Sequence, residues 1–381
     1  MTKVYVGMSG GVDSSLTAAL LVEQGYDVTG VYMKNWTQDM PGMRCPWADD
    51  LADAKRVAVQ LGIDFKVFDF ENEYKQKVVN YMIDEYRDGR TPNPDIMCNQ
   101  EVKFKLFLET ALEDGADMIA TGHYARVVSS SWAAGSLSGH TLQGTAGTPV
   151  AFGSPSATSP ANKPAARLKL AADTNKDQTY FLYRVTGEAL SKTLFPLGDF
   201  TKPEVREMAT KRGLYTASKK DSQGICFVGK IGIREFLSQY VEQKPGLVID
   251  KNTGKTLGQH DGAIFYTLGQ RHGLDVGGGL PYYVVGKDMN KNEVYVTTDL
   301  NDGALWKTDI RLGNTHWIND APSPGMYQIR VRHRAKLVQA ELSFEESNVR
   351  LKLANTERAV TSGQSVVIYD GDICLGGGIV I

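Results

Sequence analysis

Apolar and polar positions alternate in two different rhythms along the chain, and the first rhythm covers residues 1–121. Short apolar runs there are separated by longer stretches with a helical spacing of apolar residues. The pattern predicts strands at residues 4–8, 27–33, 65–70 and 118–121, and helices at residues 16–22, 48–61, 74–86 and 103–113. Alternating strands and helices predict a doubly wound, mostly parallel sheet that binds its ligands at the carboxyl ends of the strands.

The second rhythm begins at Gly246, after which Gly and Pro separate short β segments. These segments are expected at residues 263–268, 282–285, 293–297, 327–332, 340–344 and 366–369. Between the two rhythms, the sequence predicts a strand at 167–171 and a helix that opens with the capping box Thr201-Lys202-Pro203-Glu204. We therefore expect an α/β domain over residues 1–205, a small central connector over 206–300 and a C-terminal β-barrel over 301–381.

Residues 129–162 interrupt the first domain. This stretch carries no charged residue, and 26 of its 34 residues are Ser, Thr, Gly, Ala or Pro. Such a composition buries little apolar surface, so we expect a flexible loop insertion with no catalytic role.

Composition sets the class and the compartment. The 381 residues exceed what one core usually supports, and 42% apolar with 23% charged residues is typical of a globular protein. The four cysteines are scattered and form no CxxC pair, which argues against a disulfide framework or a structural zinc site. No apolar run or leader pattern predicts a membrane segment, so we expect a soluble, cytoplasmic protein without a membrane partner.

The net charge of −2 does not indicate a polyanionic partner, but its distribution is uneven. Residues 1–127 carry a net −7 and residues 201–234 a net +5, and a second basic cluster contains Arg330, Arg332, Arg334 and Lys336. Basic patches of this kind favour a nucleic-acid partner, although solvated surface charge explains them equally well.

The segment Ser9–Ser15, SGGVDSS, lies between a predicted strand and a predicted helix. Glycines let the backbone approach a phosphate, and a helix N-terminus favours negative charge. Neither GxxxxGK[ST] nor GxGxxG is present, so ordinary P-loop hydrolysis and dinucleotide binding are not favoured. The loop resembles that of the ATP pyrophosphatases, which cleave ATP to AMP and pyrophosphate.

Two cysteines fall in polar segments that suggest chemistry. Cys98 ends the turn-rich stretch TPNPDIMC, three residues after Asp95, and Cys226 follows Lys219 and Lys220 in a glycine-containing loop. Nearby positive charge lowers a thiol pKa and increases the thiolate fraction. Cys374 lies in an apolar β pattern and is expected to be a buried hydrophobe, whereas Cys45 is left undecided.

Eight segments together resemble the bacterial tRNA-specific 2-thiouridylase family. They are GMSGGVDSS, MKNW, GRTPNPDIMCN, ATGHYAR, NKDQTYFLY, KKDSQGICF, YTLGQRHGL and CLGGGI. They keep their order and span nearly the whole chain. The chain departs from the family in the insertion after Arg126 and in a short segment around 277–281.

The resemblance implies ATP-dependent replacement of the 2-oxygen of the wobble uridine by sulfur. It implies Cys226 as persulfide carrier, loaded by a cysteine desulfurase or relay protein, Cys98 as the second cysteine, and Asp95 as general acid or base. It implies ATP contacts at Gly7, Met8, Ser9, Gly10, Gly11, Val12, Asp13, Ser14, Met33 and Gly122. From the chemistry of pyrophosphate release, and not from the resemblance, we also expect Mg²⁺ near Asp13. It implies target-base or tRNA contacts at Asn93, Pro94, Asp95, His123, Lys176, Asp177, Gln178, Arg332, His333 and Gln364.

Three other interpretations remain open. A small-molecule ligase of the argininosuccinate or guanylate synthetase type would share the loop but would need neither paired cysteines nor a basic connector. A lysidine-forming enzyme would lack Cys98 and Cys226, and a non-catalytic RNA-binding scaffold would not need Asp13 or Asp95.

Overall fold

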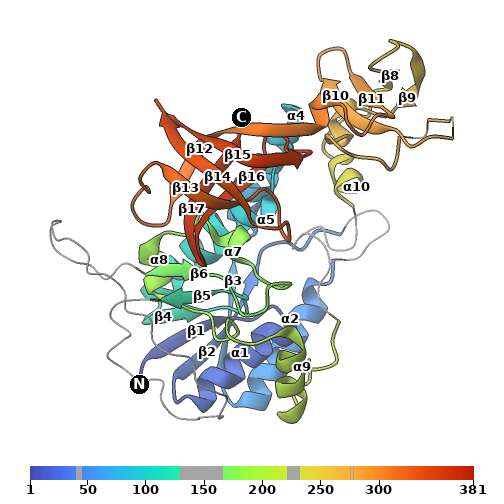
Figure 1. Cartoon of the computed structure of the whole chain (residues 1–381). Coiled ribbons are helices and arrows are strands. Elements are labelled where there is room, and N and C mark those ends of the chain that lie inside the picture. Colours follow the sequence, from blue (N-terminus) through green and yellow to red (C-terminus); the bar gives the residue numbers. More distant parts are fainter. Residues whose placement is uncertain (40–44, 129–165, 221–231, 275, 278) are drawn as a thin grey trace.

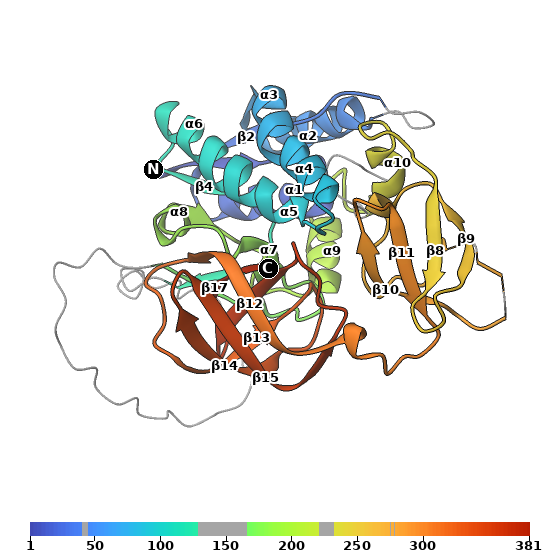
Figure 2. The same ribbon diagram turned by 90° about the horizontal axis from the view of Figure 1, so that it is seen from above.

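The computed structural model describes residues 1–381 except 40–44, 129–165, 221–231, 275 and 278. Its described part contains a five-stranded, a four-stranded and an eight-stranded sheet. Figure 1 shows the first sheet at one end of the molecule and the two β-rich parts at the other end. Seen from above, the four-stranded part lies beside the barrel, and both border the N-terminal domain (Figure 2).

The N-terminal sheet is parallel and has the strand order β3-β2-β1-β4-β7. Its strands are β1 (Lys3–Gly7), β2 (Asp27–Lys34), β3 (Asp64–Asp69), β4 (Met118–Ala120) and β7 (Thr193–Leu194). The side chains of β1 are buried on both faces, since Val4 and Val6 belong to one apolar cluster and Tyr5 to another. This two-sided burial confirms the predicted doubly wound arrangement.

Helices cover both faces of this sheet. The cluster around Val4 and Val6 includes α1 (Val12–Glu23) and α2 (Trp47–Leu61), and α9 (Lys202–Lys211) packs on α1. The cluster around Tyr5 includes η1 (Lys75–Asn80), α4 (Tyr81–Arg87), η2 (Cys98–Leu106) and α6 (Phe107–Glu113). The remaining short helices of this domain are α3 (Glu71–Tyr74), α5 (Pro94–Met97), α7 (Thr179–Leu182) and α8 (Gly187–Ser191).

The chain is helical from Pro94 to Glu113, so the helix begins nine residues earlier than predicted. The Asn93 side chain caps it by accepting hydrogen bonds from the N–H groups of Asp95 at 3.1 Å and Ile96 at 3.4 Å. Pro94 occupies the first turn, where its missing N–H costs nothing. The Pro and Asn residues that suggested a loop therefore form a helix start.

The central part has the strand order β10-β11-β8-β9. Its elements are α10 (Ile233–Leu237), β8 (Gly246–Asp250), β9 (Thr256–His260), η4 (Ala263–Phe265), β10 (Tyr283–Asp288) and β11 (Glu293–Thr297). The strand predicted at 263–268 is wrong, because Ala263–Phe265 is a 3₁₀ turn. All three of its side chains are buried, so the apolar run marks the core and not a strand.

The C-terminal part is a closed barrel of six antiparallel strands, as predicted. Its ring order is β12-β15-β14-β13-β16-β17, and a β12–β17 pairing closes it. The strands follow the short turn η5 (Gly303–Leu305) and are β12 (Trp306–Trp317), β13 (Gly325–Arg330), β14 (Val338–Glu345), β15 (Asn348–Arg358), β16 (Ser365–Asp370) and β17 (Ile373–Val380).

A hairpin from the N-terminal domain extends this barrel sheet. β5 (Arg126–Val128) pairs antiparallel with β6 (Arg167–Lys169), and β6 pairs with β17. The insertion predicted at 129–162 lies outside the described residues, and the hairpin brings its two flanks together. The boundary placed after residue 205 falls within α9. No described helix is long and apolar enough to cross a bilayer.

Candidate active site

The loop after β1 is held in one conformation by its own hydrogen bonds. Ser9 N–H donates to Ser14 Oγ at 3.1 Å, and Ser15 Oγ donates to the Gly11 carbonyl at 2.8 Å. Gly10 has φ +71°, and a Cβ there would lie 2.3 Å from the Asp50 carbonyl oxygen. Only glycine fits this position, and the loop leads straight into the N-terminus of α1.

The structure brings the predicted ATP residues together at the carboxyl edge of three neighbouring strands. Gly7 ends β1, Met33 lies near the end of β2, and Gly122 follows β4. A Cβ on Gly7 would lie 3.0 Å from Met33 Cε, and one on Gly122 would lie 2.9 Å from Ser14 N. This is the edge at which a parallel sheet binds ligands.

Asp13 has two partners that sequence reasoning missed. Lys202 Nζ lies 2.7 and 2.8 Å from the two Asp13 carboxylate oxygens, and the Tyr124 hydroxyl donates to one of them at 2.9 Å. The Lys202 backbone N–H donates to Asp173 at 2.9 Å, which anchors the start of α9. The sequence signal for Lys202 was its place in the capping box, which predicts a helix start and says nothing about Asp13.

The segment predicted to face the target base joins all three parts of the molecule. Asn93, Pro94 and Asp95 form the capped start of the 94–113 helix. Just before them, Thr91 N–H donates to the Ser362 carbonyl of the barrel at 2.9 Å. The Thr91 hydroxyl also lies 3.4 Å from the hydroxyl of Thr267 in the central part.

The environments of the cysteines differ in part from the prediction. Cys98 is 1% exposed and lies in the main apolar cluster, so its predicted polar loop is wrong. It still lies one helical turn from Asp95, while Cys226 is outside the described residues. Lys219 forms ion pairs with Asp50 at 2.8 Å and Asp53 at 2.7 Å. These carboxylates compensate its charge, which weakens the effect that Lys219 was expected to have on a thiol pKa.

Cys374 is a buried apolar residue, as predicted. It is 2% exposed, and burial raises its thiol pKa above the ordinary range. Burial also raises the pKa of Cys45, whose Sγ donates to the Trp36 carbonyl at 3.6 Å. Both thiols are therefore held in the protonated form.

Asp177 and Arg330 form an ion pair between the N-terminal domain and the barrel. Their side chains are 2% and 9% exposed and lie 2.7 Å apart. Asp177 also accepts hydrogen bonds from Ala171 N–H at 3.0 Å and the Thr179 hydroxyl at 2.8 Å. Both side chains are buried, so the position of Asp177 does not support direct tRNA contact. Arg330 does not belong to the exposed part of the predicted basic cluster.

His123 is likewise buried, at 8% exposed. Its ring packs against Phe104 and Phe195, and Nδ1 lies 2.7 Å from the Thr121 hydroxyl. Burial lowers its pKa well below the usual value, which keeps the ring neutral. Its position fits a packed strand-end histidine better than a surface contact with tRNA.

The other predicted tRNA residues lie nearer the surface. Arg332 is exposed, and Lys176, Gln178, His333 and Gln364 are partly buried. His333 stacks on Phe181 with ring centroids 4.5 Å apart, and Gln178 Oε1 accepts the Tyr124 N–H at 2.9 Å.

Most cations of the predicted basic connector face acidic groups. The pairs are Lys202 with Asp13, Lys211 with Glu207, Arg212 with Glu23, Lys219 with Asp50 and Asp53, and Arg234 with Asp261. Among the described residues, most cations of this segment are therefore paired with carboxylates, and this part of the connector does not form the free basic patch that the sequence indicated. Arg332, Arg334 and Lys336 are exposed, with no ion pair to the residues that the structure describes.

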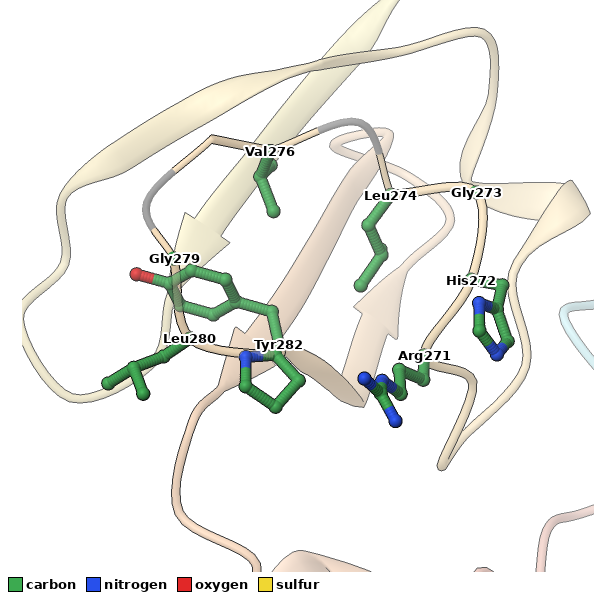
Figure 3. A pocket seen from close by; sticks show the side chains of 9 residues that line it. Arg271, His272, Gly273, Leu274, Val276, Gly279, Leu280 and Tyr282 are labelled. Atoms are coloured by element: carbon green, nitrogen blue, oxygen red, sulfur yellow. The ribbon is translucent and has the colours of Figure 1, made fainter.

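Two cavities lie away from the nucleotide loop. The larger, about 360 Å³, is formed in the central part by residues 271–274, 276 and 279–282 (Figure 3). Figure 3 shows Arg271 and His272 on one side of it and Leu280 on the other. The smaller, about 190 Å³, lies where the three parts meet.

A parallel sheet with a glycine- and serine-rich loop at a helix N-terminus defines an α/β nucleotide-binding protein, here followed by a small β module and a barrel. Family models match the three parts in order: the tRNA methyl transferase HUP domain over residues 2–230, the tRNA methyl transferase PRC-barrel domain over 234–298 and the aminomethyltransferase beta-barrel domain over 307–380.

Relatives described as tRNA-specific 2-thiouridylase MnmA, from Bacillus mycoides (strain KBAB4) and Bacillus cytotoxicus, are 43% identical over 380 residues. The alignments cover 99% of this chain and 94% of each relative. The chain belongs to the tRNA-specific 2-thiouridylase family. A solved complex of a 4-thiouridine synthetase with RNA and ATP is 17% identical, over 62% of this chain and 50% of its own. The TM-score between the two structures is 0.36.

Proposed function

We propose that this protein catalyses ATP-dependent 2-thiolation of the wobble uridine in tRNA, with release of AMP and pyrophosphate. The observation that carries the proposal is the 43% identity to tRNA-specific 2-thiouridylases over 99% of the chain. The loop geometry supports it, because a phosphate-binding loop at a strand end is what adenylation of the C2 oxygen requires.

The nucleotide loop fits the phosphates of ATP. Gly10 and Gly122 let the loop pack closely against Asp50 and the end of β4, and Lys202 adds a cation beside the loop. Mg²⁺ usually binds through one or two carboxylates together with substrate phosphates, and Asp13 is the carboxylate of this loop. Both Asp13 oxygens contact Lys202, so Asp13 fits a magnesium ion only when that contact opens. Mg²⁺ would neutralise phosphate charge, while Lys202 and the loop orient the α-phosphate.

Sulfur transfer is assigned to the two cysteines. A donor protein loads Cys226 with a persulfide, and the Cys98 thiolate attacks the Cys226 sulfur. A Cys98–Cys226 disulfide forms, and the terminal sulfur leaves as hydrosulfide, which displaces AMP from the activated C2. A two-electron reductant then restores both thiols. Asp95, one helical turn from Cys98, serves as general acid or base.

The tRNA is proposed to lie across the junction of the three parts. The wobble base belongs to a single-stranded loop, so it can turn in beside Asn93 and Pro94 at low unstacking cost. Lys176, Gln178, Arg332, His333 and Gln364 are the proposed contacts near the surface. Asp177 and His123 are proposed to act indirectly, by holding these neighbours in place.

A small-molecule ligase of the same loop class is the alternative. Pyrophosphate release from ATP, measured with and without unmodified tRNA, separates the two functions. Thiolation predicts release that depends on tRNA carrying the wobble uridine, and little with tRNA lacking it. Equal release without tRNA would support the ligase.

A further inference from the structure

The smaller cavity is built by all three parts of the molecule. Gly89 and Thr91 line it from the N-terminal domain, Lys287 from β10, and Lys307 and Thr361 from the barrel. Its volume is about 190 Å³. The packing around it is close, since a Cβ on Gly89 would lie 2.8 Å from Met289 Cγ. A group bound here would touch every part of the fold.

Among the described carboxylates, Glu357 lies opposite Lys307 in the pairing of β12 with β15. Lys287 Nζ donates to the Tyr266 carbonyl at 2.8 Å, and neither lysine forms an ion pair with the residues that the structure describes. Carboxylates beside Gly89 are already taken, because Arg90 holds Glu85 through two bonds of 2.7 Å and Asp88 through a third. Burial without a counter-ion lowers the pKa of Lys287 to about 8.

Thr361 also lines the cavity and is 9% exposed. Its Oγ1 has almost no accessible surface and no hydrogen bond within the described part of the chain, so this hydroxyl does not open onto the cavity. An anion with several oxygens would contact both ammonium groups together.

We infer that this cavity binds one backbone phosphate of the bound tRNA, which rests on the proposed function. The chain around the cavity leads to the residues proposed to meet the RNA. Thr91 lies two residues before Asn93, and Thr361 N–H donates to Gln364 Oε1 at 3.1 Å. The phosphate next to the turned-out nucleotide therefore passes within reach of the cavity, and its binding would fasten the three parts together.

The test is tRNA affinity measured against salt for the full-length protein. The double variant Lys287→Gln/Lys307→Gln should make the salt dependence weaker. The magnitude of the slope of log affinity against log salt should fall by ~0.7–0.9, as expected for one phosphate. Lys255→Gln is the matched control, because it removes an exposed charge of the same central part outside the cavity. Equal slopes for wild type and double variant would overturn the inference.

Thr361→Val is a control that keeps both lysines. It removes a hydroxyl that has no hydrogen bond to the described residues and almost no accessible surface, so the melting temperature and the affinity for tRNA should both hold. A loss of tRNA affinity as large as that of the double variant would count against a phosphate held by the two lysines.

A free anion is distinguished by titrating inorganic phosphate and pyrophosphate and recording the melting temperature. Stabilisation that disappears in the double variant, together with an unchanged tRNA slope, would assign the cavity to a free anion and reject the RNA phosphate. Failure of wild type to bind tRNA at all would reject the proposed function instead.

Discussion

At the scale of single residues, the nucleotide loop depends on one ion pair. Lys202 is 10% exposed at its side chain and Asp13 32%, and they meet at 2.7 Å. Removing one partner leaves the other charge largely buried and less well compensated, which is more costly than removing both. The pair therefore allows a test in which stability and catalysis respond differently.

We expect Asp13→Asn and Lys202→Met each to lower tRNA-dependent pyrophosphate release by ~10²–10³-fold, as for a lost electrostatic contact to a reacting group. Each should also lower the melting temperature. The variant that carries both substitutions should recover stability. It should stay inactive, because it lacks both side chains that are proposed to act on the ATP phosphates. Parallel thermal and pyrophosphate assays measure this. Activity that returns together with stability would contradict a role in ATP chemistry.

His333 provides a pH test. Burial lowers the pKa of His333 to about 4, and the positive charge of Arg334 contributes to this shift. The unfolded chain binds a proton near pH 6.5 and the folded one only near pH 4, so His333 adds stability above pH 6.5 that is lost as pH falls toward 4. The melting-temperature difference between wild type and His333→Gln should be constant above pH 7 and shift against wild type below pH 6. A pH-independent difference would show an ordinary surface histidine.

Local sequence predicted the loop, but not its partners. Strand, glycines and helix start are neighbours in the chain, so SGGVDSS could be interpreted without a structure. Lys202 lies 189 residues from Asp13, and only the packing of α9 on α1 brings them together. The burial of His123 and Asp177 is equally a property of the folded whole, and the tRNA contacts expected of them came from the family resemblance and not from their local sequence.

At the scale of elements, the β5–β6 hairpin determines how the insertion is attached. Val128 pairs with Arg167, so the residues that flank the insertion lie on adjacent strands within hydrogen-bonding distance. The stem is fastened to the barrel through Leu168, which lies opposite Cys374 on β17. The entropy cost of closing a loop between these two strands rises only slowly with the length of the loop.

Replacing residues 131–160 by a short Gly-Ser turn should therefore leave 2-thiolation within a few-fold of wild type. The melting temperature should hold or rise, because a shorter loop costs less entropy to close. Thiolation assays and thermal unfolding check this. Lost thiolation in a variant that still folds would show that the insertion carries a function that its composition does not indicate.

Elements with strong periodicity were predicted well, and irregular ones were not. The helix predicted at 48–61 is observed as Trp47–Leu61, and the strand at 293–297 matches β11. The run at 263–268 was mistaken for a strand because short buried 3₁₀ turns and strands share the same apolar composition. β12 was missed because two register shifts interrupt its alternation. β15 was missed although Val349, Leu351 and Leu353 alternate inward.

At the scale of the whole molecule, the uneven charge has two separate causes. The cations of 201–234 mostly pair with carboxylates, whereas those at 332–336 face solvent. Only uncompensated cations release counter-ions when RNA binds. Apart from the smaller cavity with Lys287 and Lys307, the barrel and not the connector should therefore supply the salt-dependent part of tRNA binding.

Arg332→Gln/Arg334→Gln should lower the salt slope of tRNA binding by ~1.4–1.8, for two phosphate contacts. Lys211→Gln/Arg212→Gln, a matched loss of two charges from α9, should leave the slope unchanged, because Glu207 and Glu23 already hold those cations. Affinity titrations at several salt concentrations decide between them. A larger loss for the α9 variant would restore the connector as the tRNA-binding surface.

The central claim is sulfur transfer to the wobble uridine, and mass spectrometry of tRNA nucleosides tests it most directly. Unmodified tRNA incubated with ATP, a persulfide donor and this protein should yield 2-thiouridine. The Cys226→Ser variant should yield none while still binding tRNA, and Cys98→Ser should accumulate adenylated tRNA without turnover. Uridine left unchanged by wild-type protein that consumes ATP, or 2-thiouridine formed by Cys226→Ser, would contradict the account.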